Sequence, residues 1–267
     1  NQERVQRRPL HWHSATPAKI QRMQRLSQLF PDNYLEQIGN EAIYHQAGIW
    51  RSLPPAGLQG AKVCELKPSQ GQMRLYDAAG QALSQADVTL LAAGTGMHAL
   101  TSLALRNVRG QSILIRSKHT LPEFLTGDIN ITYLGGQDFL VGSTYEIDGS
   151  DPQTRLLDTD RLISDLAQTL QHRDFTLASP HAGIRTVFSD RVIGAGLLPA
   201  RTLKTARMDH SMGQTSGPAP ACYALMGLGS HGATHAPLAA EAIVSAVCGA
   251  PSPLPRDLAH STRLDRF

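Results

Sequence analysis

The stretch Gly227–Val247, GLGSHGATHAPLAAEAIVSAV, constrains the fold most, because three glycines stand directly ahead of an apolar helical run. Thr234 as a cap and Pro237 in the first turn mark the predicted start of this helix. Its apolar face is predicted to consist of Leu238, Ala239, Ala242, Ile243, Ala246 and Val247. Glycines let a backbone come close to a neighbouring group, and a helix N-terminus offers N–H groups with a partial positive charge. The loop therefore either meets a ligand or packs as a helix entry against other protein.

Two other glycine patterns follow apolar strands. Residues 87–93 form a continuous apolar segment, which predicts a strand buried on both faces as in a parallel sheet. It leads into Gly94-x-Gly96-x-x-Ala99, formally a dinucleotide fingerprint, but the next strand ends in Arg116 and Ser117 rather than in an acidic residue. In residues 191–199 a proline closely follows the glycines, which favours a strand and a turn.

The remaining patterns indicate helices and antiparallel strands. Helices are predicted at 17–30, with a basic outer face, and at 158–171 with Asp158 or Thr159 as cap. The inward residues of the second helix are Leu162, Ile163, Leu166 and Leu170. Strands are predicted at 61–66, at 73–77 with a hairpin turn at Ala79–Gly80, and in an antiparallel sheet at 111–116, 129–134 and 138–144. Residues 42–55 are expected to form loops or edge strands.

Composition excludes several protein classes. A 267-residue chain with 41 % hydrophobic and 18 % charged residues is typical of a globular protein, and its formal charge of +3 favours an ordinary solvated surface over a nucleic-acid patch. The three cysteines, Cys64, Cys222 and Cys248, are widely spaced, which favours a reducing cytoplasm. No apolar run approaches the roughly 20 residues of a membrane helix, so no membrane partner is expected.

Four segments together resemble one enzyme family. They are VTLLAAG (88–94), NVRGQ (107–111), HAGIRTVFSDRVIGAG (181–196) and GLGSHGATHAPLAAE (227–241). In this order they are similar to the FAD-dependent D-amino-acid-oxidase/glycine-oxidase superfamily. Within that superfamily they are most similar to the flavin domains of bifunctional enzymes that form 5-methylaminomethyl-2-thiouridine in tRNA.

The resemblance implies a fold and a domain arrangement. An α/β fold is expected, with a partial FAD-binding Rossmann-like domain interleaved with an antiparallel-sheet substrate domain. The substrate domain would comprise residues 1–56 and 106–180, and the FAD-binding domain residues 57–105 and 181–250. Residues 251–267 would form a surface tail.

The resemblance also implies site residues. Arg185 would clamp a substrate carboxylate or, alternatively, form a structural salt bridge. Tyr133 could donate a hydrogen bond to that carboxylate or belong to the core, and His231 could contact flavin or substrate. Asp190 is expected to hold a turn. Contacts to FAD are implied for Val63, Ala93, Gly94, Gly110, Gly183, Gly227, Leu228, Gly229, Ser230, His231 and Gly232. No metal is expected, since His11 and His13 have no third ligand.

The sequence departs from the family pattern at its start. No βαβ motif with G-x-G-x-x-G precedes Trp12, and a family helix is missing between Leu58 and Ala61. Ile193 and His231 replace the usual proline and arginine. The chain is therefore expected to begin inside the substrate domain, with the FAD pyrophosphate site supplied by an N-terminal segment or by a second chain.

Three functions remain open at this stage. The first is oxidation of the carboxymethylaminomethyl group of a tRNA wobble uridine, with loss of the carboxymethyl part. The second is oxidation of a small amine or amino acid by an enzyme of the same superfamily. The third is a cofactor-free remnant or subunit.

Overall fold

The computed structural model describes residues 5–13, 16–28, 35–38, 41–50, 61–119, 121, 123–204 and 220–266. Two compact units alternate along the chain. Unit 1 comprises Asn1–Ala56, Arg109–Glu146 and Asp151–Gly183, and unit 2 comprises Gly57–Val108, Ile147–Ser150 and Ile184–Phe267. Within the described part of the chain, no helix is both long enough and apolar enough to cross a bilayer.

Unit 1 is built on a mostly antiparallel sheet. Its strand order is β12-β8-β11-β10-β9-β1-β3-β2, and β13 pairs with β8 outside this path. β1 pairs with β9 in parallel, whereas β8, β11, β10 and β9 pair antiparallel, which confirms the predicted antiparallel sheet. The bounds are β1 Val5–His13, β2 Leu35–Ile38, β3 Glu41–Trp50, β8 Leu105–Ser117, β9 Phe124–Gly127, β10 Asn130–Gly135, β11 Asp138–Gly142, β12 Glu146–Ile147 and β13 Phe175–Phe188.

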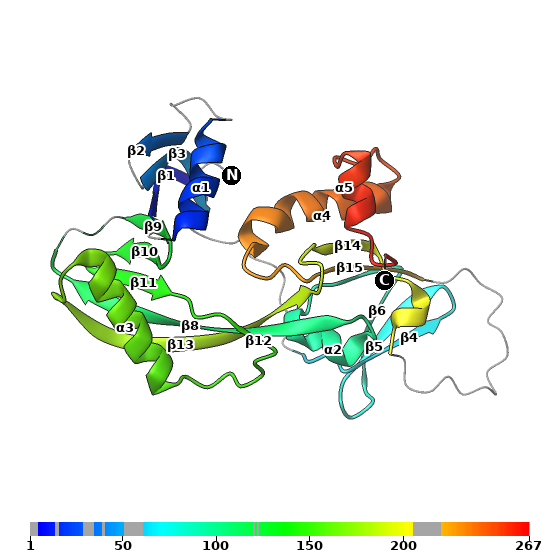
Figure 1. Ribbon diagram of the computed structural model, residues 1–267. Helices are drawn as coiled ribbons and strands as arrows, with labels where there is room; N and C mark the ends of the chain where they lie inside the picture. The colour runs from blue at the N-terminus through cyan, green and yellow to red at the C-terminus, as the bar shows by residue number, and fades with distance from the viewer. Residues whose placement is uncertain are drawn as a thin grey trace. The chain divides into compact units, whose positions relative to one another are not determined.

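Two helices belong to unit 1. Helix α1 (Pro17–Ser27) and helix α3 (Leu156–Leu170) confirm the two amphipathic predictions, and α3 lies against the sheet in Figure 1. Leu162 and Leu166 of α3 are buried among Ile113, Ile115 and the apolar residues of β10 and β11. Asp158 and Thr159 do not cap α3 as predicted, because the helix begins earlier, after Arg155, and both side chains instead bond to strand β8.

The prediction of loops or edge strands at 42–55 is wrong for residues 42–50. They lie in β3, which is paired on one side with β1 and on the other with β2. The strand continues past Gly48 to Trp50, so the prolines at 54 and 55 come after its end and do not interrupt the pairing. Residues 51–60, where a family helix was expected to be absent, lie outside the described residues.

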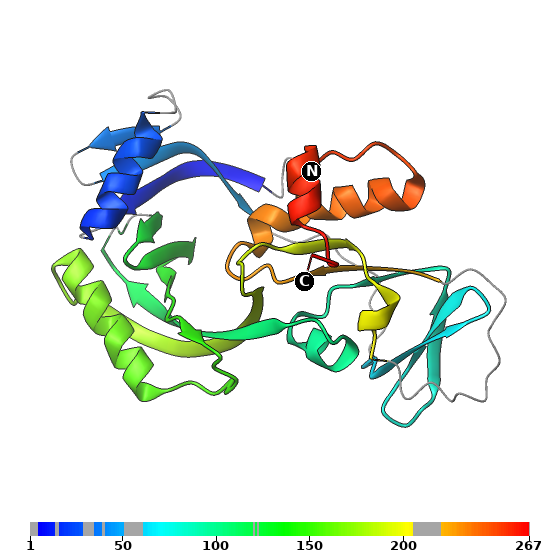
Figure 2. The same cartoon turned by 45° about the vertical axis from the view of Figure 1, so that its right-hand side comes forward.

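Unit 2 contains two small three-stranded sheets. β4 (Glu65–Ser69), β5 (Gln72–Tyr76) and β6 (Ala82–Ala86) form an antiparallel meander, visible in Figure 2, and its second turn confirms the hairpin at Ala79–Gly80. The other sheet has the order β14-β15-β7, with β15 parallel to β7 and antiparallel to β14. Its strands are β7 Val88–Leu91, β14 Gly194–Leu197 and β15 Ala221–Met226.

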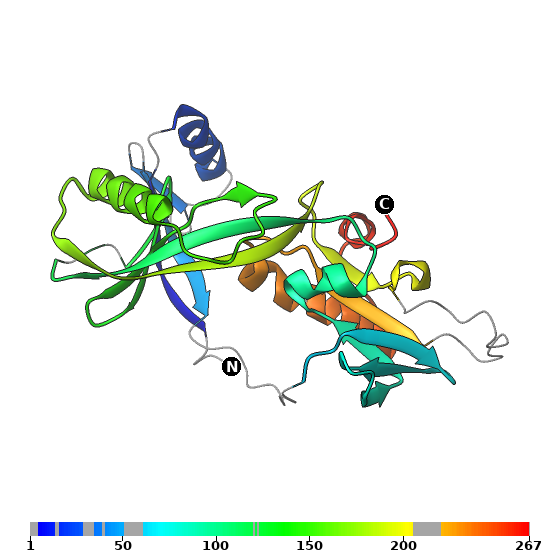
Figure 3. The ribbon, with the colours of Figure 1, turned by 90° about the horizontal axis from the view of Figure 1, so that it is seen from below.

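The helices of unit 2 are α2 (Met97–Leu100), α4 (Gly232–Cys248) and α5 (Arg256–Ser261). Helix α4 packs on β14 and β15 through Ala239 and Ile243, as can be followed in Figure 3. Leu238 and Val247, predicted on the same inward face, are 46 % and 40 % exposed, because only a narrow stripe of the helix meets the sheet.

Strand β7 is buried on one face only, which corrects the prediction of burial on both. Thr89 and Leu91 are buried, whereas Val88 and Leu90 are 42 % and 50 % exposed. The parallel pairing was nevertheless predicted correctly. A short apolar run cannot distinguish one buried face from two, because it lacks the alternation that normally marks the solvent side.

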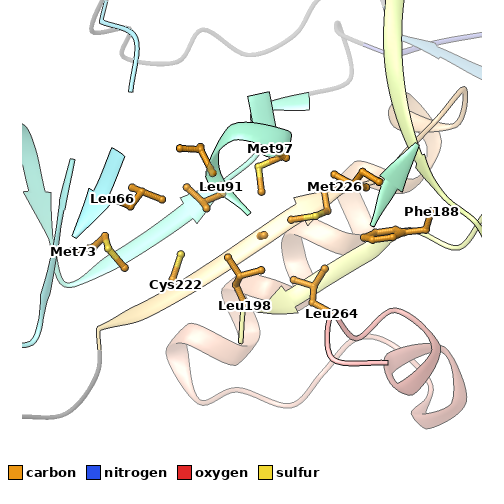
Figure 4. Packing of buried hydrophobic residues seen from close by; sticks show 12 residues of the cluster. Leu66, Met73, Leu91, Met97, Phe188, Leu198, Cys222, Met226 and Leu264 are labelled. Carbon is orange, nitrogen blue, oxygen red and sulfur yellow. The ribbon is translucent and has the colours of Figure 1, made fainter. Parts of the chain in front are cut away.

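The main core of unit 2 joins its two sheets to the C-terminus. Leu66, Met97, Phe188, Cys222 and Leu264 are buried in one cluster, shown in Figure 4. Most described residues of the predicted surface tail 251–267 are exposed, but Leu264 is 2 % exposed and anchors the segment to this core, and α5 precedes it. The proline-rich composition of the tail hid this single anchoring leucine.

Burial gives the cysteines different reactivities. Desolvation raises the pKa of the Cys222 thiol to about 11, whereas Cys248 is exposed. At about pH 8, alkylation of the native protein should label Cys248 first and leave Cys222 unmodified, because only the thiolate reacts. Peptide mass mapping after a short exposure to iodoacetamide checks this result. Equal labelling of both cysteines in the native state would contradict the packing of β15.

Candidate functional site

Two glycine-containing loops lie at the same edge of a parallel strand pair in unit 2. β7 ends at Leu91 and is followed by the exposed segment 92–96, while β15 ends at Met226 and is followed by the glycine loop, residues 227–232. The carboxyl ends of parallel strands are the usual ligand-binding edge of α/β sheets. The structure thus brings Ala93 and Gly94 to the edge that also carries the glycine loop.

The glycine loop is fastened to the end of strand β13. The N–H of Gly229 donates to the carbonyl of Thr186 at 3.0 Å, and Val187 forms a bridge with Leu228. Gly227 and Gly229 have φ of +70° and +53°. A Cβ at Gly227 would lie 2.6 Å from Cδ2 of Phe188, and one at Gly229 would lie 2.9 Å from Cγ1 of Val187. Their bare backbones are therefore required by packing against β13.

Gly227→Ala is expected to lower the free energy of unfolding by about 3 kcal/mol, because the methyl group adds overpacking to a left-handed backbone. Gly80→Ala is the matched control, since Gly80 has a similar φ of +78° but no atom within 4 Å of its Cβ position. The control should lose only about 1 kcal/mol. Denaturant unfolding of both variants measures the difference. Equal losses of unfolding free energy in the two variants would show that the Phe188 ring moves aside without destabilising the protein.

Arg185 lies on β13 directly before the residues that hold this loop. Side chains alternate along a strand, so Arg185 shares a face with Val187, while Thr186 and Phe188 point to the core. Arg185 is half-buried, and its Nε atom lies fully inside the protein. The structure therefore brings Arg185 and the glycine loop together within unit 2, at one end of β13.

The two histidines of the loop region lie at the start of α4. His231 is the N-terminal cap residue, its ring centroid lies 5.4 Å from that of His235, and both residues are exposed. Thr234 is inside the helix and is not the cap, and Pro237 lies beyond the first turn, because α4 already begins at Gly232. The first turn of α4 contains no acidic residue, so its partial positive charge is not neutralised there.

Unit 1 contains Tyr133, Gly110 and Gly183, whereas the glycine loop belongs to unit 2. The contacts that hold the glycine loop within unit 2 therefore do not involve these three residues. Tyr133 is partly buried against the core, and its ring centroid lies 5.3 Å from that of Phe139. This packing gives Tyr133 a structural role on β10. Gly183 lies on β13, where a Cβ would meet no atom within 4 Å.

The remaining candidates in unit 2 differ in role. Val63 packs against the main core cluster. Asp190 holds the turn after β13, as predicted, by accepting from the N–H of Val192 at 2.9 Å and from Nε of Arg266 at 2.9 Å. Partial burial works to raise the pKa of Asp190, but the hydrogen bonds from Arg266 and Val192 outweigh it and lower the pKa.

The edge of the parallel pair fits one side of a flavin. Gly94 has φ +54° and open space at its Cβ position, and Ala92–Gly96 is exposed. The first turn of α4, whose N–H groups face the loop end, contains no acidic residue. Gly94 and the positions Ser230–Gly232 could therefore hold a flavin edge, whereas Gly227 and Gly229 serve the packing of the loop.

A buried polar network in unit 1 was missed at the sequence level. Arg109 on β8 has no exposed side-chain area; its Nη1 donates to Asp158 Oδ2 at 2.6 Å and its Nε to the carbonyl of Asp151 at 2.9 Å. Its Nη2 donates to the carbonyl of Gln153 at 2.6 Å and to Oε1 of Gln111 at 2.9 Å. The signal was an arginine and a glutamine at positions 109 and 111, in phase with the buried apolar residues Ile113 and Ile115 of the same strand.

Residues 56–246 match the family described as FAD dependent oxidoreductase (DAO). The chain is 35 % identical over 196 residues to the "tRNA 5-methylaminomethyl-2-thiouridine biosynthesis bifunctional protein MnmC" of Caulobacter vibrioides, covering 73 % of this chain and 30 % of that protein. The protein of the same name from Paraburkholderia xenovorans is 29 % identical over 227 residues, covering 78 % and 34 %. The chain thus spans about a third of the length of these relatives.

Solved structures share the fold. Glycine oxidase from Geobacillus kaustophilus superposes with a TM-score of 0.73 at 15 % identity, covering 100 % of this chain and 78 % of that one. Iminodiacetate oxidase from Chelativorans sp. BNC1 gives 0.69 at 16 % identity, covering 97 % and 76 %. These likenesses confirm the predicted α/β fold, with its Rossmann-like part and its antiparallel sheet.

Proposed function

Because this chain belongs to the DAO family of FAD-dependent oxidoreductases, we propose that it oxidises the carboxymethylaminomethyl group of a tRNA wobble uridine and removes the carboxymethyl part. The observation that carries the proposal is the position of Arg185 beside the glycine loop. The similarity to relatives named for tRNA thiouridine biosynthesis supports the choice of substrate.

Each residue at the site has a defined task in this proposal. FAD, when bound, would accept a hydride from the carbon between the substrate nitrogen and its carboxylate. Arg185 binds the carboxylate through two parallel N–H···O bonds and so orients that carbon. The N–H groups at the start of α4 and the open backbone at Gly94 hold the flavin edge.

The reaction balances with water as co-reactant. The carboxymethyl carbon loses a hydride, which FAD would accept, and the amine loses a proton, so that the C–N bond becomes an imine. Water adds to the imine carbon, and the C–N bond then breaks. The products are the aminomethyl uridine and glyoxylate, with the two electrons held by the reduced flavin.

The adenosine and pyrophosphate of FAD are assigned in this proposal to another segment or chain. The expected result is that riboflavin and FAD bind the 267-residue chain with similar affinity, measured by quenching of flavin fluorescence. A strong preference for FAD would show that this chain holds the pyrophosphate itself.

A second function has its own support. The fold similarity to glycine oxidase extends over the whole chain, which favours oxidation of a small amine. The two functions differ in what the enzyme turns over. The chain, supplied with FAD, should convert tRNA carrying carboxymethylaminomethyl-uridine, as measured by mass spectrometry of digested nucleosides.

Three outcomes of this assay discriminate the functions. Turnover of the modified tRNA with little turnover of glycine or sarcosine supports the first. Turnover of the free amino acids alone assigns the second. An absence of flavin binding together with an absence of both reactions leaves a cofactor-free subunit.

A further inference from the structure

A cavity of about 620 Å³ lies in unit 1, on segments that follow β8 and precede β13. Arg116, Lys118 and His119 come from the end of β8 and the residues after it. Arg173 and Asp174 come from the connection between α3 and β13, and Phe175 is the first residue of β13. We call this cavity the basic pocket. Its volume is in the range of small-molecule sites.

Among the described residues, two cations of the basic pocket have no acidic partner. Nε of Arg116 lies 2.8 Å from Asp138 Oδ1, and Nε2 of His119 lies 3.3 Å from Asp174 Oδ2. Lys118 and Arg173, both exposed, make no ion pair with any carboxylate in the described ranges. The pocket therefore retains an excess of positive charge.

The rings of Phe175 and His119 line the same cavity. Phe175 is half-buried and packs against the core beneath the sheet, which fixes its position. The rings of His119 and His172 lie 5.5 Å apart between centroids. Cations beside a fixed aromatic ring are the combination that binds unpaired RNA, because phosphates pair with the cations and bases stack on the ring.

Stabilisation of a helix end accounts for only part of this arrangement. Arg173 follows the C-terminus of α3, where a cation interacts favourably with the helix dipole. Lys118 follows a strand, however, and lies in the same cavity. A dipole effect does not explain why the two cations converge.

We propose that the basic pocket binds a phosphodiester and an adjacent unpaired base of the RNA substrate. This inference rests on the proposed tRNA-modifying function and assigns to it a binding site in unit 1, outside the glycine loop of unit 2. Lys118 and Arg173 bind the phosphate, and the ring of Phe175 stacks on the base.

The test compares two double variants that lose the same charge. Lys118→Ala/Arg173→Ala removes the two cations without an acidic partner, and Arg22→Ala/Arg25→Ala removes two exposed cations on α1 in the same unit. Binding of tRNA to the flavin-supplied chain is measured over a range of salt concentrations. The pocket variant should bind about tenfold more weakly, and the slope of log K against log salt should fall by about 0.7 to 0.9, because the two cations together contact one phosphate. The α1 variant should match the wild type.

The outcomes separate this inference from the function on which it rests. Equal weakening in both variants, or none in the pocket variant, overturns the pocket while tRNA turnover by the wild type still supports the function. A wild type that oxidises free amino acids but binds no tRNA overturns the function and the pocket together. Binding of adenosine monophosphate as tight as that of tRNA, lost in the pocket variant, overturns RNA as the occupant and assigns a small phosphorylated ligand.

Discussion

Replacing Arg109 by alanine is expected to lower the free energy of unfolding by about 3–5 kcal/mol, because removing one partner of a buried ion pair leaves the other partners unsatisfied. The guanidinium serves four acceptors, namely Asp158, Gln111 and the carbonyls of Asp151 and Gln153. Without it, the carbonyls of Asp151 and Gln153 and the Asp158 carboxylate lose this donor, and the Gln111 amide oxygen keeps only the N–H of Arg155. The loop before α3 would then be joined to β8 mainly by the two hydrogen bonds between Gln111 and the backbone of Arg155.

Denaturant unfolding measures this loss, and hydrogen exchange of residues 151–155 locates it. Arg109→Lys should lose about 2 kcal/mol, since one ammonium cannot reach all four acceptors. Arg161→Ala is the control, because the Arg161 side chain is 74 % exposed and its pair with Asp165 is 3.7 Å long, so a change within about 0.5 kcal/mol is expected. If Arg109→Ala unfolded like the control, the network would contribute nothing to stability.

The elements with clear periodicity were predictable from the sequence. Helix α3 follows its 3.6-residue pattern, with Leu162 and Leu166 inward, and strands β10 and β11 follow their alternation. The boundaries were less accurate, because the predicted cap residues Asp158 and Thr159 instead accept long-range hydrogen bonds from Arg109 and Gln111. No local pattern encodes a partner about 50 residues away in the chain.

The glycine loop, too, could be predicted from the sequence only in part. Its place after an apolar strand and before a helix was predicted from residues 227–247 alone. The reason for its glycines was not, since the atoms that exclude a side chain at Gly227 and Gly229 belong to Phe188 and Val187 on another strand. The sequence marks where a backbone must come close to something, and only the structure identifies the neighbour as protein.

Tyr133 and Arg185 illustrate how far site residues could be predicted from the sequence. Both were named from a family resemblance, and the structure places them in different units. Tyr133 packs on Phe139, which fits the alternative that it belongs to the core, and its hydrogen bond to a substrate carboxylate stays a prediction. Arg185 lies next to the residues that hold the glycine loop, on the face of β13 away from the core, and so it keeps the candidate role of carboxylate clamp.

Arg185→Lys is expected to lower kcat/KM for the carboxymethylaminomethyl substrate by about 100-fold. Lysine keeps the positive charge but loses the second parallel hydrogen bond, and a hydrogen bond to a charged group is worth about 1.5–3 kcal/mol. Arg185→Gln also removes the charge and should lower kcat/KM by about 1,000-fold. Steady-state kinetics of the flavin-supplied chain measure both changes, and the flavin absorption band reports whether the cofactor still binds.

A substrate without the carboxylate tests whether Arg185 acts through that group. The wild type should prefer tRNA carrying carboxymethylaminomethyl-uridine over tRNA carrying methylaminomethyl-uridine, which lacks only the carboxylate. In Arg185→Lys this preference should shrink by the same factor as kcat/KM, because the variant and the analogue remove the same interaction. Arg191→Lys, an exposed change in the turn after β13, should preserve the preference. If Arg185→Lys slowed both substrates equally, its guanidinium would support the protein structure and would not bind the carboxylate.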